Sequence, residues 1–202
     1  MDMGEHLDSD FYFRHLKRIS RAGRWYKKFF LSPLLFLTAR RFGPRIVEVG
    51  AGIGSGVLGT FSSNTVGLDV NSYAVNYCRE LGLSVKLIDK TGHFPCQDGE
   101  FDACILDNVL EHIENPQKTL DECYRITGTK GALVVVVPGS RGFAIDPDHK
   151  VYYDTKKLNE LDPRWSLLNC FATPSLFLSE TLSRRMKQYC VVAVFVKKDL
   201  PD

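Results

Sequence analysis

The sequence predicts a doubly wound α/β fold around a mostly parallel sheet, built as a single domain. Its 202 residues, 44% of them hydrophobic and 25% charged, suffice for one sizeable core but not for two comfortable domains. Short β-rich runs also alternate with helical segments, and no hairpin-length turn interrupts this alternation until late in the chain. Such alternation is typical of right-handed βαβ units, whose helices cover both faces of a parallel sheet.

Five strands are expected before Pro138, with helices between some of them. The strands are predicted at 45–49, 65–70, 84–88, 102–106 and 132–137, and the helices at 54–61, 72–81 and 116–126. Beyond Pro138 the pattern changes to a loop at 139–150. Helices near 154–161 and 174–187, a mixed run near 165–171 and a strongly β-type run at 189–196 complete the predicted elements.

Residues 11–41 differ in charge from the rest of the chain. Residues 11–41 carry nine basic side chains and no acidic one, whereas the rest of the chain has 17 basic and 24 acidic residues. At about 100° per residue, apolar side chains of this segment share one helical stripe and basic side chains the opposite face. We therefore predict that residues 1–42 form a basic amphipathic arm or lid, weakened at Gly23. Its apolar stripe would contain Tyr12, Leu16, Ile19, Tyr26 and Phe30.

Composition excludes several classes of protein. No apolar run reaches the roughly 20 residues that a transmembrane helix needs, and no charged segment followed by an apolar one resembles a secretory leader. The six cysteines form no Cys-x-x-Cys pair and have no histidine at zinc-ligand spacing, so we expect reduced thiols, no metal site and a cytoplasmic location. They are Cys78, Cys96, Cys104, Cys123, Cys170 and Cys190.

Glycine-rich and acidic segments follow the predicted strands where a ligand would bind. In an open parallel sheet the ligand crevice lies beyond the carboxyl ends of the strands. The first strand runs into Glu48-Val49-Gly50-Ala51-Gly52-Ile53-Gly54, whose glycines allow backbone amides to approach a ligand closely. The next three strands end at Asp69, Asp89 and Asp107-Asn108. A carboxylate such as that of Asp69 can accept both hydroxyls of a ribose.

Four motifs in register carry a family resemblance. They are Glu48-x-Gly50-x-Gly52-x-Gly54, Gly67-Leu68-Asp69, Asp89, and Phe101-Asp102-Ala103-Cys104-Ile105 followed by Val109-Leu110-Glu111-His112-Ile113. In this order and spacing they resemble the class I S-adenosylmethionine-dependent methyltransferases of the small-molecule type, over roughly residues 45–138. The resemblance implies a Rossmann-like, mostly parallel seven-stranded sheet with an antiparallel C-terminal strand. The methyltransferase domain would span 43–202, with 139–187 as its acceptor side.

The resemblance also implies the residues that bind the cofactor, S-adenosylmethionine. In that family the loop after the first strand holds the methionine end, and the carboxylate after the second strand holds the ribose. The end of the third strand holds the adenine, and the end of the fourth lies by the sulfonium and the substrate entrance. The implied residues are, in that order, Glu48, Gly50, Gly52 and Gly54; Asp69 with Val70; Asp89 with Lys90; and Asp107 with Asn108.

Catalysis at such a site needs little beyond positioning. The sulfonium already makes the methyl group electrophilic, so the protein must align a nucleophile and exclude water. A hydroxyl acceptor would also need a base, and His149 in the loop after the fifth strand is the candidate catalytic residue, with Asp146 or Asp148 to orient it. The alternative is that His149 is a solvated loop residue. Glu111 and His112 are interpreted as packed or hydrogen-bonded residues in preference to bases.

The sequence indicates the acceptor less clearly than it indicates the cofactor. Residues 148–153 are similar to bacterial methyltransferases of surface-sugar and lipid-linked glycan synthesis, which implies O-methylation of a sugar, a glycolipid or another small acceptor. Nucleic acid is not expected, because Asp107-Asn108-Val109-Leu110 stands where base amino-methyltransferases carry a Pro-Pro motif. The basic segment 11–41 is expected either to cover the cofactor cleft or to contact anionic lipid at the inner membrane face.

Two other functions stay open at the level of sequence. One is a protein that binds S-adenosylmethionine without catalysis. The other is an NAD-dependent oxidoreductase, because residues 54–59 have the Gly-x-Gly-x-x-Gly form with Asp69 downstream. That fingerprint should begin at the strand end near Gly50, and read from there its third glycine position is Ser55. The register therefore favours the methyltransferase, and the oligomeric state is not indicated.

Overall fold

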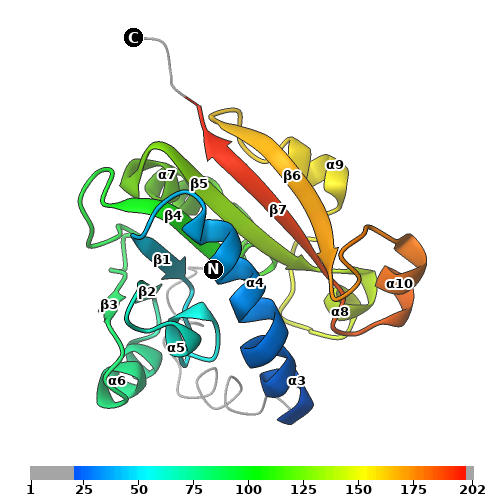
Figure 1. The fold of residues 1–202 in the computed structure, drawn as a ribbon, viewed down its shortest axis with the longest axis horizontal. Helices are drawn as coiled ribbons and strands as arrows, with labels where there is room; N and C mark the ends of the chain where they lie inside the picture. Colours follow the sequence, from blue (N-terminus) through cyan, green and yellow to red (C-terminus); the bar gives the residue numbers. More distant parts are fainter. Residues whose placement is uncertain (1–20, 199–202) are drawn as a thin grey trace.

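The fold is a twisted sheet with helices packed on both of its faces, and the computed structural model describes residues 21–198 (Figure 1). The strands are β1 (Ile46–Val49), β2 (Thr65–Asp69), β3 (Val85–Leu87), β4 (Phe101–Asp107), β5 (Thr127–Pro138), β6 (Trp165–Thr173) and β7 (Cys190–Lys197). They form one seven-stranded sheet in the order β3-β2-β1-β4-β5-β7-β6. The first five strands pair in parallel, and β7 runs antiparallel to both β5 and β6.

This topology confirms the predicted fold class, including the antiparallel C-terminal strand. The chain moves outward from β1 through β2 to β3 and then returns to the other side of β1 with β4, so the strand order reverses beside β1. Val49 pairs with Leu68 on β2 and with Leu106 on β4, so the three strands end at the same level. The segments that follow them therefore meet at one edge of the sheet, which is where this fold binds ligands.

The helices lie close to most predicted positions. They are α3 (Arg21–Tyr26), the π-helix η1 (Lys27–Leu31), α4 (Ser32–Arg40), α5 (Val57–Thr60), α6 (Ser72–Glu80), the 3-10 helix η2 (Leu110–His112), α7 (Gln117–Ile126), α8 (Ser140–Ala144), α9 (Thr155–Asn159) and α10 (Glu180–Arg185). Among the described residues, none of these helices has the length and apolarity to cross a membrane.

The prediction of a helix over 174–187 was wrong in its first part, and α8 was not predicted. The helix starts only at Glu180, because the Ser179 side chain accepts a hydrogen bond from the Leu182 amide and caps the first turn. Residues 174–178 instead form a loop, in which Leu176 has a φ of +63°. Pro174 and this left-handed residue are incompatible with the continuous helix that the apolar spacing indicated.

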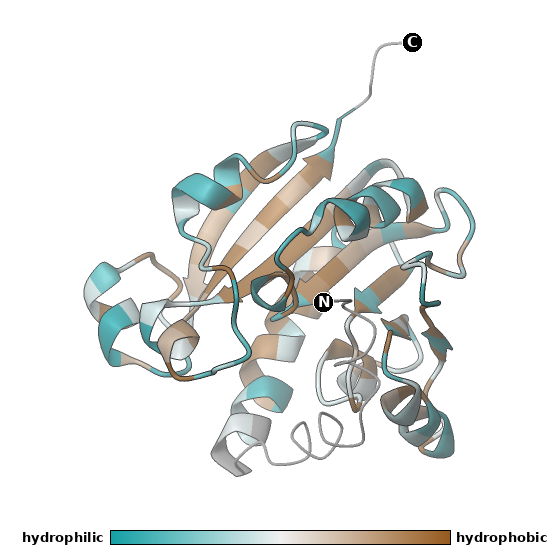
Figure 2. Ribbon diagram, turned by 180° about the vertical axis from the view of Figure 1, so that it is seen from behind, coloured by the Kyte–Doolittle hydropathy of each residue, from teal (hydrophilic) through white to brown (hydrophobic). Residues whose placement is uncertain are grey.

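Alternate residues of the central strands face two different cores. On β4, Ala103 and Ile105 pack in the cluster that contains Leu35 of α4, whereas Cys104 and Leu106 pack in the cluster that contains Leu120 of α7. This period of two is the geometry of a strand covered on both faces. The hydropathy colouring shows the same arrangement, with hydrophobic strands inside and hydrophilic helix surfaces outside (Figure 2). The rigid sheet thereby positions the loops at its carboxyl edge.

The described part of the N-terminal arm is one helical run through α3, η1 and α4, and it corrects the predicted apolar stripe. Leu31, Leu35 and Ala39 are buried, whereas Phe30 is 53% exposed. The wider turn of the π-helix changes the helical phase between Tyr26 and Leu31, so the stripe cannot be extrapolated at 3.6 residues per turn. The predicted stripe residues at 12, 16 and 19 lie outside the described residues.

Candidate active site

The loop after β1 keeps its glycines in backbone conformations that other residues rarely adopt. The φ angle is +74° at Gly50, +53° at Gly52 and +71° at Gly54. The amides of Gly50 and Ala51 donate to the carbonyl of Leu68 at 2.8 and 3.0 Å, which ties the loop to the end of β2. The sequence folds in this way because glycine carries no Cβ that would oppose positive φ. The result is a loop whose bare backbone lines a cavity.

Asp69, at the end of β2, connects that strand to the glycine loop. Its Oδ2 accepts the Gly52 amide at 2.6 Å, and its Oδ1 accepts the Asn71 amide at 2.8 Å. The side chain is almost completely buried. Burial raises the pKa of Asp69, while the donated amide hydrogen bonds act in the opposite direction. Each carboxylate oxygen has a second lone pair, and Asp69 lines the cavity together with Val70.

Glu48 on β1 is buried and acts on the start of α5. Its Oε1 accepts the Val57 amide at 3.2 Å, and its Oε2 accepts the Leu58 amide at 2.6 Å. Burial and then the nearby Asp107 carboxylate raise the pKa of Glu48 to about 7. A Cβ atom on Gly56 would lie 2.1 Å from Oε1, so glycine is required there. Glu48 therefore supports the loop as well as lining the cavity.

Asp89 and Lys90 follow β3 but do not line the cavity. The Asp89 carboxylate is occupied within its own loop, where its Oδ1 accepts the Thr91 amide at 2.8 Å and the His93 amide at 3.1 Å. The Thr91 hydroxyl hydrogen bond and the His93 amide lower the pKa of Asp89. Ile88, Gly92 and Phe94 provide the cavity wall in this region.

Asp107 and Asn108 close the end of β4, and Lys27 from the arm joins them. Asn108 has a φ of +57°, and its Nδ2 donates to Asp107 Oδ1 at 2.6 Å. Lys27 Nζ lies 2.9 Å from Asp107 Oδ2, and both residues line the cavity. Burial opposes the charge of Lys27, but Asp107 outweighs it and the pKa of Lys27 is raised. Lys27 was not predicted as a site residue. The one indication in the sequence was its position next to Tyr26, a residue of the predicted apolar stripe.

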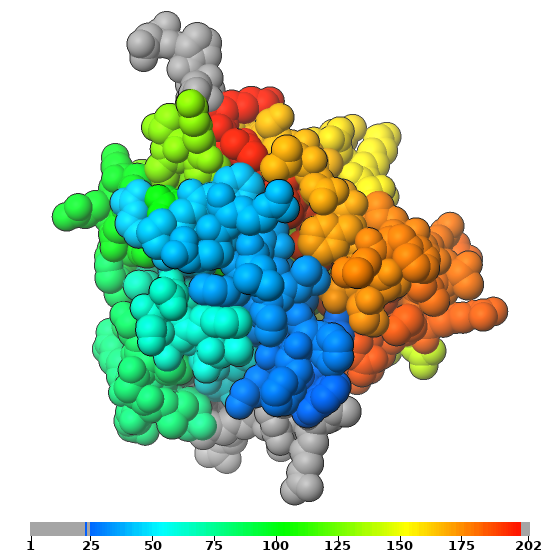
Figure 3. All heavy atoms as spheres, viewed as in Figure 1, coloured from blue at the N-terminus to red at the C-terminus, as the bar shows by residue number. Residues whose placement is uncertain are grey.

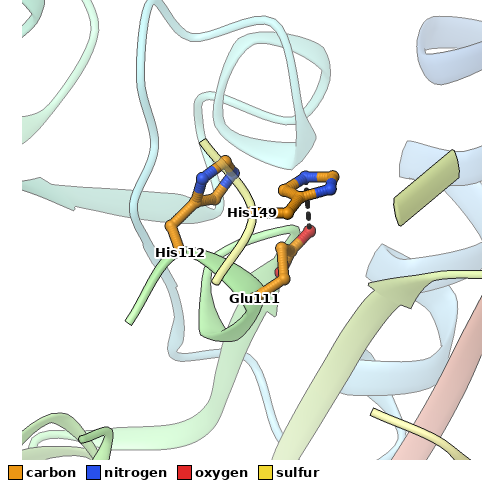
Figure 4. Close-up of side chains that lie close together, drawn as sticks. All are labelled: Glu111, His112 and His149. Atoms are coloured by element: carbon orange, nitrogen blue, oxygen red, sulfur yellow. Dashed lines mark ion pairs between the residues drawn. The ribbon is translucent and has the colours of Figure 1, made fainter. Parts of the chain in front are cut away.

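His149 lies at the acceptor side of the cavity, close to two carboxylates. The amides of Lys150 and Val151 donate to the Glu111 carbonyl at 2.7 and 3.1 Å, which holds the loop after α8 against η2. His149 Nε2 is then 3.9 Å from Glu111 Oε1 (Figure 4). The same atom is 3.8 Å from Asp146 Oδ2. Its side chain is only 7% exposed, so it is not a solvated loop residue.

The orientation of His149 comes from a backbone group and not from Asp148. His149 Nδ1 lies 3.0 Å from the Phe143 carbonyl, and the Phe143 ring stacks on the imidazole at 5.3 Å between centroids. Asp148 instead offers its own carbonyl to His112 Nδ1 at 3.3 Å. The structure thus brings together Glu111, His112 and His149, which the sequence placed in two separate segments.

These segments surround one cavity of about 670 Å³, within the usual range for small-molecule sites. Its cofactor side offers the groups that an S-adenosyl ligand needs. They are a glycine backbone, the buried Asp69 carboxylate, apolar walls from Ile88 and Phe94, and the buried Asp107 carboxylate. The residues present therefore fit this cofactor, although three of the predicted residues, Gly54, Asp89 and Lys90, lie outside the wall. The acceptor side adds polar residues of its own, which are Asp146, His149, Lys187 and Gln188.

Comparisons of sequence identify the central part of the chain. Residues 47–135 match the family model described as a methyltransferase domain. Two uncharacterized proteins of Methanocaldococcus jannaschii are 29% identical over 96 residues and 36% identical over 93 residues. These segments cover 48% and 46% of this chain, and 46% and 40% of the two relatives, so the match spans less than half of their length.

Comparisons of structure cover almost the whole chain. A chain of the Haloferax volcanii complex that contains the Trm112 methyltransferase activator has a TM-score of 0.68 at 14% identity, covering 98% of this chain and 99% of that one. S-adenosylmethionine-dependent methyltransferases from Thermotoga maritima and Aquifex aeolicus have TM-scores of 0.65 and 0.64 at 19% and 17% identity, each covering 93% of this chain and 98% of theirs. Such identities show a shared fold. The family model matches a methyltransferase domain at residues 47–135, and together with these structures and the cavity it supports S-adenosylmethionine as the cofactor.

Proposed function

We propose that the protein transfers the methyl group of S-adenosylmethionine to a hydroxyl of a small acceptor, a sugar or the sugar of a glycolipid. The observation that carries this proposal is the buried imidazole of His149, whose Nε2 lies at the acceptor side of the cavity between Glu111 and Asp146. Lys187 and Gln188 add polar groups there that suit a ligand with several hydroxyls. A chain that merely stored the cofactor would have no use for a buried imidazole at this position.

In this proposal the residues on the cofactor side bind and orient S-adenosylmethionine. The glycine loop would receive the methionine end, Asp69 the ribose hydroxyls, and the wall of Ile88 and Phe94 the adenine ring. Asp107 and Asn108 would lie beside the sulfonium. When bound, S-adenosylmethionine supplies an electrophilic methyl group, so the protein needs only to align the acceptor and keep water out.

The acceptor side would remove the proton of the attacking hydroxyl. The Phe143 carbonyl can only accept, so Nδ1 of His149 must carry the proton and Nε2 of the neutral ring keeps a free lone pair. That lone pair can take the hydroxyl proton as the methyl group is transferred. Asp146 and Glu111, both within 4 Å of Nε2, would stabilise the resulting imidazolium.

Turnover with radiolabelled S-adenosylmethionine and a panel of sugars, nucleotide sugars and glycolipids tests the proposal. His149→Ala should lower kcat by about 10²–10⁴-fold, since a positioned base contributes about that much. Binding of S-adenosylhomocysteine should stay unchanged. His93→Ala, at an exposed histidine paired with Glu122, is the matched control. Tight cofactor binding without transfer to any acceptor would instead favour the non-catalytic binding protein.

A contact with a lipid surface is a second proposal, supported by the exposed side of the arm. Trp25, Phe29, Phe30 and Leu37 are each more than half exposed, and Lys28 is exposed among them. The arm lies on the same face as the end of β6 and the following loop (Figure 3), and Tyr26 Oη lies 2.6 Å from Thr173 Oγ1. Aromatic and basic side chains on one surface suit a membrane interface with anionic lipid.

Cosedimentation with vesicles tests this contact. The full chain should sediment with anionic but not with neutral vesicles, and high salt should release it. Replacing Trp25 and Phe29 together by Ser should weaken binding while cofactor binding persists. Leu81→Ser, at a similarly exposed leucine outside the arm, is the control. Equal recovery of all variants in the supernatant would remove the membrane contact and leave the arm as a cover of the cavity.

A further inference from the structure

The proposed reaction does not explain why the carboxylate of Glu111 is buried without a hydrogen-bond partner. Glu111 is fully buried, and neither of its carboxylate oxygens has a hydrogen-bond partner in the described structure. A buried carboxylate without a partner costs several kcal/mol, so such groups are normally paired, protonated or bound to a metal. Asp107, the other buried carboxylate with an unpartnered oxygen, differs because Lys27 balances its charge. Within the described residues, the one side chain at salt-bridge distance that could balance the charge of Glu111 is His149, and only when it is protonated.

Two imidazoles lie next to this carboxylate. Among the described residues, Glu111, His112 and His149 are the one group of histidine, cysteine and acidic side chains close enough to share a metal ion, with ligand atoms all within 4.8 Å of one another. The rings of His112 and His149 are 4.8 Å apart and tilted by 60°, so they are not stacked face to face. Figure 4 shows both rings and the Glu111 carboxylate gathered at one place, from η2 and from the loop after α8.

Both histidines are held in the same way by backbone carbonyls. His149 Nδ1 is 3.0 Å from the Phe143 carbonyl, and His112 Nδ1 is 3.3 Å from the Asp148 carbonyl. Since a carbonyl cannot donate, each Nδ1 carries the hydrogen, and each Nε2 keeps its lone pair. This is the arrangement that orients metal-binding histidines, which usually donate their second nitrogen to a carbonyl or carboxylate.

We infer that Glu111, His112 and His149 form a binding site for a divalent transition-metal ion that opens onto the acceptor side of the cavity. Two imidazoles and one carboxylate are a ligand set of catalytic zinc sites and of other first-row metals. Metal bonds of about 2.0–2.2 Å place ligand atoms about 3–4 Å apart, so the side chains need to move by only about an ångström. Both histidines line the cavity, whereas Glu111 lies behind them, so the remaining coordination positions face the ligand.

The consequence for the proposed reaction is a change in what activates the acceptor. An acceptor with two neighbouring oxygens, such as a vicinal diol, would fill the open positions. The ion would lower the pKa of the bound hydroxyl, which releases its proton to water. A metal uses the same Nε2 lone pair as a proton, so His149 would then be a ligand and not a base. The inference rests on the proposed function for this role, but not for metal binding itself.

Metal binding is measured on the full chain without a histidine tag, after treatment with EDTA and desalting. Titration with Zn²⁺ or Mn²⁺ by calorimetry, and metal analysis after gel filtration, should find about one ion per chain. With Co²⁺, the absorption bands of a protein-bound ion should appear. His149→Ala, His112→Ala and Glu111→Gln should each weaken binding at least 10-fold, whereas His93→Ala should not. S-adenosylhomocysteine binding by every variant checks that it is folded.

The outcomes separate this inference from the proposed function. A wild-type chain that binds no ion, or variants that bind it as well as the wild type, would overturn the metal site. If such a metal-free chain methylates a hydroxyl and loses activity in His149→Ala, His149 is the base of the proposed reaction. A chain that binds one ion at these residues but methylates nothing supports the site and rejects the reaction.

Discussion

The two sides of the cavity satisfy their buried polar groups in opposite ways. On the cofactor side, Glu48 and Asp69 each accept two backbone amides, so their positions follow from the strands and loops that carry those amides. On the acceptor side, Glu111, His112 and His149 face one another, and the Glu111 carboxylate has no hydrogen-bond partner. The first side is preorganised by the backbone. The second can gain a proton, an ion or a ligand without breaking any existing bond.

This difference separates binding from activation. A preorganised site binds one ligand tightly because little reorganisation is needed. A group of titratable side chains with unused lone pairs is suited to chemistry, because its state changes when the acceptor arrives. Changes on the cofactor side should therefore reduce affinity or stability, and changes on the acceptor side should reduce turnover.

The largest effect, on cofactor affinity, is expected from substitutions of Asp69 and Gly52. Gly52→Val places a β-branched residue at a φ of +53° and should abolish S-adenosylhomocysteine binding. Asp69→Ala removes the carboxylate proposed to accept the ribose hydroxyls and should weaken binding by about 10- to 150-fold, because hydrogen bonds to a charged acceptor contribute roughly 1.5–3 kcal/mol. Calorimetry on folded variants measures both. Wild-type affinity in both variants would reject the assignment of the cofactor side.

Glu48 should make stability depend on pH. Its pKa of about 7 in the folded chain exceeds the ordinary value of 4.5, so folding favours the protonated form. The free energy of unfolding should therefore fall as pH rises from about 4.5 to 7 and carry a constant penalty above that range. Glu48→Gln removes this titration, so the difference between variant and wild type should change by roughly 1–3 kcal/mol over the range.

Urea unfolding at pH 5, 6 and 7.5 measures that difference, which cancels the titration of other groups. The variant itself carries a fixed cost, because the glutamine NH2 replaces one of the two oxygens that accept the Val57 and Leu58 amides and so places a donor against a donor. A difference that stays constant with pH would show that Glu48 keeps its charge in the folded chain.

The cofactor side could be predicted from sequence because its signals are local. An apolar strand, the glycines after it and the acidic residue at the next strand end lie in short segments, and the sheet topology brings them together. What the sequence could not show is the partner of each carboxylate. Glu48 caps α5 through amides nine and ten residues away, and the Asp89 carboxylate closes its own loop outside the cavity wall.

The acceptor side could not be assembled in the same way. His149 follows Glu111 and His112 by almost forty residues, and no spacing rule for metal ligands applies over that distance. Their proximity depends on two amides, those of Lys150 and Val151, which bind the Glu111 carbonyl. Spacing alone predicted no metal, and it could not have indicated the inferred metal site, which depends on contacts made only in the folded chain. Lys27 was missed for a related reason, since the π-helix changes which arm residues face inward.

Substituting Lys27 should change the free energy of unfolding less than substituting Glu48, because the Lys27 side chain is 24% exposed. Lys27→Met keeps the aliphatic stem but leaves Asp107 Oδ2 without a countercharge, which should cost about 1–2 kcal/mol of stability. Asp107→Asn in the Lys27→Met background should recover part of this loss. Urea unfolding of the single and double variants gives the coupling energy. Additive losses would mean that the ion pair does not stabilise the fold.

The smallest effect is expected where the arm meets β6, at the hydrogen bond between Tyr26 Oη and Thr173 Oγ1. Tyr26→Phe removes one hydroxyl and should lower stability by about 0.5–1.5 kcal/mol, the usual net value of a hydrogen bond. Thr173→Val removes the hydroxyl that pairs with Tyr26 and keeps a similar side-chain volume. Because Thr173 is buried, this substitution should lower stability by about as much as Tyr26→Phe. If the arm packs on the body in solution, the double variant should lose less than the two single losses together, since both break one bond. Fully additive losses would indicate that this contact is absent in solution, and the arm would then be held beside the cavity by the Lys27–Asp107 ion pair and by its buried residues Leu31, Leu35 and Ala39.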